Sequence, residues 1–97
     1  MIRHMVLFKF RPDITETEKV NIINGLTHLY ESYPERLVAH HGKDLGIQTG
    51  NYEYGICVDF TDEAQFLRYG TNAEHLKLIN DHIKGAIIAR SAIQFEF

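Results

Sequence analysis

Apolar and polar residues alternate along several stretches of the chain, which is the pattern of β-strands with one buried face. The alternation covers residues 2–10, 52–60 and 86–97, and a shorter, more polar run occupies residues 37–45. The clearest case is 52–60, where one face carries Tyr52, Tyr54, Ile56, Val58 and Phe60. In the last run, Ile87, Ala89, Ser91, Ile93, Phe95 and Phe97 share one side. The pattern therefore predicts four strands.

Between the strands, apolar residues recur at the spacing of a helix. Thr15 and Glu18 form a capping-box pattern that opens the first helix, and Tyr33-Pro34 closes it. The apolar stripe of this helix consists of Ile22, Leu26, Leu29 and Tyr33. A second helical segment runs from Asp62 and is expected to break at Gly70. A further capping pattern at residues 71–74 then opens a helix with His75, Leu76, Ile79 and Ile83.

This order of elements is that of the ferredoxin-like βαββαβ fold, an α+β fold whose four-stranded antiparallel sheet carries both helices on one face. The other face of the sheet is left uncovered. We expect it to hold Met5, Leu7, Gly55, Cys57, Ile88 and Ala92 at its centre, with Arg3, Lys9, Glu53, Asp59, Arg90 and Gln94 interleaved or toward the ends. An apolar centre with a charged rim is typical of an interface. The sequence thus predicts a homodimer through the sheet face.

Length and charge exclude several classes of protein. The 97 residues suffice for one domain, expected over residues 1–97. The net charge is −3, and the ten Lys and Arg residues are scattered, which argues against nucleic-acid binding. No apolar stretch approaches about 18 residues, so we expect no membrane association. The single cysteine, Cys57, can form no internal disulfide, which fits a cytoplasmic protein.

Metal and cofactor sites have no support in the sequence. His40 and His41 are neighbours on a strand, so their rings point to opposite faces and cannot bind one metal ion within a chain. No other set of residues has metal-ligand spacing, and no glycine-rich phosphate loop is present. We therefore expect no cofactor and no metal ion bound by side chains, whereas a divalent ion bound by backbone carbonyls would leave no pattern in the sequence.

His4 is the unusual residue of the first strand, because it shares a face with Ile2, Val6, Phe8 and Phe10. A neutral imidazole has one donor and one acceptor, and burying either without a partner costs about 1–3 kcal/mol. His4 is thus either a structural histidine with a hydrogen bond in the core or part of a ligand pocket.

Three further polar rings are expected on the same side of the sheet. Tyr54 lies on the core-facing side of its strand, Tyr69 near the end of the short helix, and His75 in the first turns of the next helix. With His4, and with Phe8 among the apolar walls, they resemble the lining of a small-molecule cavity. The alternative is a core filled by its own side chains, with tyrosine hydroxyls that reach water.

Several segments together resemble the stress-responsive A/B barrel (Dabb) family. These are residues 2–10 with their histidine, Gly42, Val58-Asp59-Phe60, and the spacing from Tyr69 to His75. The resemblance spans essentially the whole chain. It implies a dimeric α+β barrel in which two ferredoxin-like protomers pack sheet against sheet, each with a cavity between its sheet and its helices.

The chain is also similar in part to a plant polyketide cyclase of that family, which closes a linear polyketide without a cofactor. In that enzyme the residues matching Tyr69 and His75 form the working pair, with the residue matching His4 beside them. Two departures argue against transferring its substrate. Tyr54 stands where the cyclase has a histidine, and residues 72–74 lack the proline usual in the family just before His75.

Two functional hypotheses follow, beside the filled core. In the first, a dimeric protein binds a small aromatic or polyketide-like molecule in the cavity without catalysis. In the second, the protein is a cofactor-independent enzyme with His75 as general base. Tyr69 would orient this base or donate to the developing enolate oxygen. His4, Tyr54 and Phe8 would bind the substrate in either case.

Overall fold

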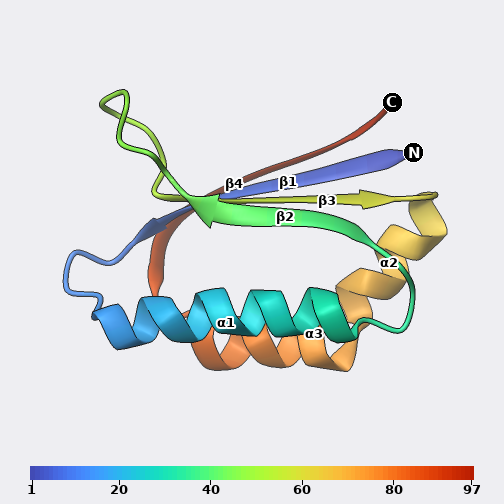
Figure 1. Ribbon diagram of the computed structural model, residues 1–97, viewed down its shortest axis with the longest axis horizontal. Helices are drawn as coiled ribbons and strands as arrows, with labels where there is room; N and C mark the ends of the chain where they lie inside the picture. Colours follow the sequence, from blue (N-terminus) through green and yellow to red (C-terminus); the bar gives the residue numbers. More distant parts are fainter.

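The computed structural model describes all of residues 1–97 as one antiparallel sheet with helices on one face (Figure 1). The strands are β1 (Ile2–Phe10), β2 (Val38–Lys43), β3 (Tyr54–Phe60) and β4 (Ile87–Glu96), in the spatial order β2-β3-β1-β4. The helices are α1 (Glu16–Ser32), α2 (Glu63–Thr71) and α3 (Ala73–Leu78), which continues into a π-helical turn, η1 (Ile79–Ile83). The predicted ferredoxin-like βαββαβ fold is confirmed.

The first helix starts at the predicted capping box. The Thr15 hydroxyl accepts a hydrogen bond from the backbone N–H of Glu18 at 3.1 Å, and the Glu18 carboxylate accepts one from the backbone N–H of Thr15 at 3.2 Å. The helix buries Ile22, Leu26 and Leu29 against the sheet. The capping box therefore fixes where this apolar stripe begins.

The break in the second helical segment lies two residues after the predicted position. α2 passes through Gly70 and ends at Asn72, whose ψ of 130° leaves the helical region. The Asn72 side-chain oxygen then accepts a hydrogen bond from the backbone N–H of His75 at 3.0 Å and caps α3. Asn72 therefore both ends one helix and starts the next, and it places His75 in the first turn of α3.

The register of β4 differs from the prediction. Phe8 pairs with Arg90, Val6 with Ala92 and His4 with Gln94, so these three β4 residues share the face of β1 that points at the helices. The register shifts between Lys9 and Phe10, which pair with Ala89 and Ile87 and leave Ile88 as an extra residue in β4.

This β-bulge has a direct consequence for the two faces of the sheet. The prediction that Arg90, Ala92 and Gln94 lie on the outer face is wrong, because the extra residue Ile88 reverses the alternation of everything after it. The outer face of β4 instead carries Ala89, Ser91, Ile93 and Phe95.

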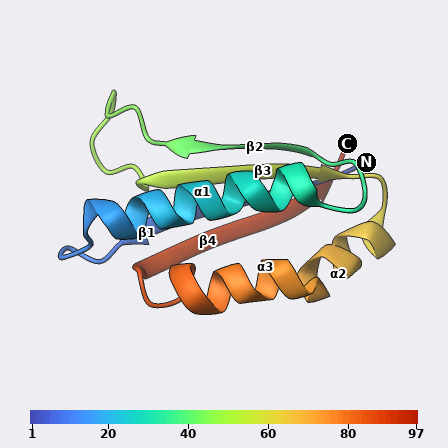
Figure 2. The same cartoon turned by 60° about the horizontal axis from the view of Figure 1, so that its bottom comes forward.

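The core lies between the sheet and the helices, and its most deeply buried side chains are Phe60, Ile22, Leu26 and Val58. Helices α1 and α3 run side by side under the sheet (Figure 2). They approach closely at Gly25, where an added Cβ would lie 2.4 Å from Cδ1 of Leu78. Glycine thus permits this contact.

The outer face of the sheet is open in the single chain. Met5, Leu7, Ile93 and Phe95 are between 37% and 57% exposed there. Beside them, Arg3 and Asp59 form a two-bonded ion pair at 2.8 and 2.9 Å. None of the helices has the length and apolar character needed to cross a membrane.

Candidate ligand cavity

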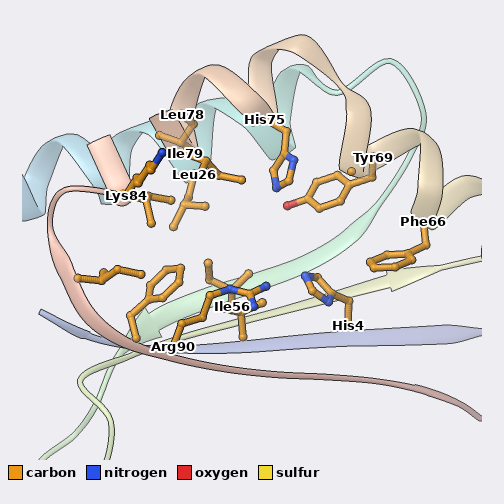
Figure 3. A pocket seen from close by; sticks show the side chains of 15 residues that line it. His4, Leu26, Ile56, Phe66, Tyr69, His75, Leu78, Ile79, Lys84 and Arg90 are labelled. Atoms are coloured by element: carbon orange, nitrogen blue, oxygen red, sulfur yellow. The ribbon is translucent and has the colours of Figure 1, made fainter. Parts of the chain in front are cut away.

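A cavity of about 430 Å³ lies between the helix-facing side of the sheet and the segment α2–α3–η1 (Figure 3). Its lining is formed by His4, Val6, Phe8, Leu26, Ile56, Phe66, Tyr69, Gly70, His75, Leu78, Ile79, Ile83, Lys84, Ile87 and Arg90. Ten of these 15 residues are hydrophobic. The volume and the mostly apolar walls are those of small-molecule sites. The side chains of the protein therefore leave space between the sheet and this helical segment.

His4 lies on the sheet side of the cavity and is only 8% exposed. Its Nδ1 is 2.9 Å from Nε2 of Gln94. Because the amide nitrogen donates, Nδ1 accepts and the ring proton sits on Nε2, which is left for the cavity (Figure 3). His4 thus has a structural hydrogen bond on one nitrogen and a free donor on the other.

Burial, and secondly the charge of Arg90, lower the pKa of His4 to about 4. The ring is therefore neutral near pH 7. This agrees with its role as an acceptor toward Gln94, which a protonated imidazole could not fill.

His75 faces His4 from the helix side of the cavity (Figure 3). Its Nδ1 is buried and has no hydrogen-bond partner in the protein. Burial lowers the pKa of the ring, and the polar backbone of Gly70 acts in the opposite direction. His75 is thus a neutral imidazole near pH 7 whose buried Nδ1 has no hydrogen-bond partner in the protein.

Tyr69 packs against His75, with ring centroids 4.2 Å apart and planes inclined by 36°. Its hydroxyl is not bonded to His75 but lies 2.9 Å from the hydroxyl of Tyr30 in α1. Burial raises the pKa of Tyr69 far above its ordinary value, so the phenol stays protonated. The structure therefore brings Tyr69 and His75 together by ring contact, with Tyr30 as the hydrogen-bond partner of the phenol.

Tyr54 is not among the residues that line this cavity. Its hydroxyl is hydrogen-bonded to Nδ1 of His41 on β2, and Nε2 of His41 lies 3.1 Å from Oγ1 of Thr27. Tyr54 is buried in this separate cluster near α1, although it shares the helix-facing side of the sheet with His4. Of the five predicted site residues, His4, Phe8, Tyr69 and His75 line one cavity and Tyr54 does not.

Four polar residues of this region were missed by the sequence reasoning: Tyr30, Gln94, Lys84 and Arg90. Tyr30 follows Leu26 by four positions, so its helical spacing was a usable signal. Gln94 and Arg90 reach the helix-facing side only because of the bulge in β4, and no residue pattern marks that bulge.

No group of three or more His, Cys, Asp or Glu side chains could hold a metal ion.

Solved structures with the same fold include a dimeric ferredoxin-like protein of unknown function from Thermobifida fusca YX. It is 29% identical to this chain, with a TM-score of 0.90, over 99% of this chain and 90% of that one. A Dabb family protein from Mesorhizobium loti is 17% identical, with a TM-score of 0.81, over 98% and 94% of the two chains. The hydroxynitrile lyase of Passiflora edulis is 18% identical, with a TM-score of 0.82, over 97% and 90%.

Among curated proteins, none matches the chain. A family model does: that of the stress-responsive A/B barrel domain matches residues 2–97, which is nearly every residue of the sequence. The match agrees with the ferredoxin-like fold and with the Dabb family protein among the similar structures. The chain therefore belongs to the stress-responsive A/B barrel (Dabb) family.

Proposed function

We propose that this chain forms a cytoplasmic homodimer and binds a small, largely apolar molecule, aromatic or polyketide-like, in the cavity between sheet and helices. The observation that carries the proposal is the open apolar cavity, at one end of which two imidazoles keep hydrogen-bonding capacity that the protein does not use. A buried polar atom without a partner costs about 1–3 kcal/mol. A ligand that supplies the partner would offset that cost.

The dimer part of the proposal is supported by the apolar residues on the outer face of the sheet. Met5 and Ile93 are register partners at its centre, and both are exposed in the single chain. Burying such a face against a second copy removes apolar surface from water. The Thermobifida fusca relative, at 29% identity, is described as dimeric.

Calorimetry and thermal shift with two probes test ligand binding: para-butylbenzoate and its neutral analogue para-butylbenzamide. We expect at least one probe to bind and to raise the melting temperature. Val6→Phe fills part of the cavity and should abolish this binding, whereas Val20→Phe on the exposed surface of α1 should not. Failure of both probes, or equal binding by Val6→Phe, would contradict the proposal.

A second candidate function is catalysis of proton abstraction beside a carbonyl group. The observation that favours it is the ring contact between the protonated Tyr69 and the neutral His75, whose buried Nδ1 has no partner. His75 would accept the proton, and the Tyr69 phenol would donate a hydrogen bond to the developing enolate. At least one protein with the same fold is an enzyme, the hydroxynitrile lyase of Passiflora edulis.

Deuterium exchange into the acetyl group of para-butylacetophenone separates an enzyme from a binding protein. Catalysed exchange should be lost in His75→Ala and kept in His28→Ala, which changes an exposed histidine of α1. Because burial lowers the pKa of His75, the rate should be flat above about pH 7 and fall only in acid. Exchange no faster than in buffer would leave binding as the function.

A further inference from the structure

The charges around the cavity all have one sign. The cavity is lined by five titratable residues and by no Asp or Glu. These five are His4, Tyr69, His75, Lys84 and Arg90. Arg90 arises from β4 at the position paired with Phe8, and its side chain extends along the floor of the cavity toward His4 (Figure 3). The bulge at Ile88 is what turns this guanidinium to the cavity side.

Arg90 differs from most arginines of the chain in having no carboxylate partner. Three of the five arginines form ion pairs: Arg3 with Asp59, Arg11 with Asp13 and Glu18, and Arg68 with Glu35. Arg90 forms neither an ion pair nor a side-chain hydrogen bond, and its charge lowers the pKa of both His4 and His75, which fits a guanidinium that lies in the same cavity as these rings.

A neutral apolar ligand would be a poor match for this guanidinium. It would remove water from the charge without supplying an acceptor, which is costly. A carboxylate fits the planar guanidinium in a two-bonded arrangement. The attraction between such a pair is several times stronger in a partly buried site than in water.

We infer that the cavity selects organic anions: molecules with an aromatic or alkyl body on the apolar walls and a carboxylate bound by Arg90, with Nε2–H of His4 as a second donor. This inference rests on the proposed binding function and narrows it to one class of ligand. Arg90 is then the residue that determines specificity for the acid over its neutral analogues.

The test compares the affinities of para-butylbenzoate and para-butylbenzamide, which have nearly the same size and differ in charge. Calorimetry on the full chain should show the acid binding at least about tenfold more tightly. Arg90→Met should remove this preference, because the acid loses the guanidinium partner while the amide no longer lies against an unpaired charge. Arg36→Met, which removes an exposed arginine without an ion pair, should keep the preference.

Two results would overturn the inference. If the wild-type chain binds acid and amide equally, the cavity has no anion selectivity, although the proposed binding function survives. If neither probe binds, the binding function and the inference fall together. The wild-type comparison needs no variant to fold, and Arg90 is exposed, so its replacement should leave the melting temperature without ligand almost unchanged.

Discussion

Single residues of the cavity were predictable where the strand and helix periods alone decide a side chain's direction. His4 lies on the buried face of β1, and Tyr69 and His75 turn inward from α2 and α3. Contacts between these side chains were not predictable. Tyr54 lies on the predicted, helix-facing side of the sheet. Its long side chain, however, places the hydroxyl in a hydrogen bond with His41 and not in the cavity.

His4 should make the stability of the fold depend on pH. The pKa of His4 is about 4 in the folded chain and near 6.5 in the unfolded chain, so the unfolded state binds more protons between these values. This contribution to stability is complete above about pH 6.5 and is lost as the pH falls toward 4. Burial lowers the pKa of His75 and His41 in the same direction.

Urea denaturation at about pH 7.5 and about pH 5 measures this effect. His4→Gln should lose less free energy of unfolding between the two pH values than the wild-type chain does. His28→Gln, on the exposed surface of α1, is the control and should behave like the wild type. An equal loss in His4→Gln and wild type would show that His4 does not titrate as its burial implies.

At the scale of elements, the order of the strands and α-helices followed from periodicity and capping patterns. The π-helical turn η1 and two further details did not. The alternation along residues 86–97 continues without a visible fault, so it could not show that Ile88 is unpaired and that the two faces exchange there. The helix break lies at Asn72 and not at Gly70, because an asparagine side chain can cap α3 while glycine offers only flexibility.

The capping box of α1 gives a direct test at this scale. Thr15→Ala removes the hydroxyl that accepts from the backbone of Glu18 and should cost about 1 kcal/mol of stability. Thr17→Ala, in the same helical turn but without such a bond, should cost much less. The measurement is the free energy of unfolding in urea. Equal losses in the two variants would mean that the cap does not anchor the helix.

At the scale of the whole molecule, the uncovered face of the sheet was predicted to be apolar, and its centre is. The residues that β4 contributes are not the predicted ones, because the bulge replaces Ala92 by Ile93 beside Met5. An interface predicted from either set would be apolar, so the proposal of a dimer does not depend on the bulge. The choice of β4 residues to mutate in a test of the dimer does depend on the bulge.

Ile93→Arg should separate the proposed dimer, since it places a charge at the centre of the outer face, where Ile93 pairs with Met5. Sedimentation at micromolar concentration should show the wild type as a dimer and this variant as a monomer. Val20→Arg on α1 is the matched control and should stay dimeric. A wild-type chain that sediments as a monomer would contradict the dimer.

The most direct test of the binding cavity is a methyl-detected NMR titration of the full chain with para-butylbenzoate. We expect the methyl signals of the cavity residues to shift, namely those of Val6, Leu26, Ile56, Leu78 and Ile83. The signals of Leu45 and Ile47 in the exposed loop should not shift. Shifts confined to Met5, Leu7 and Ile93 on the outer face of the sheet, or no shifts at all, would contradict it.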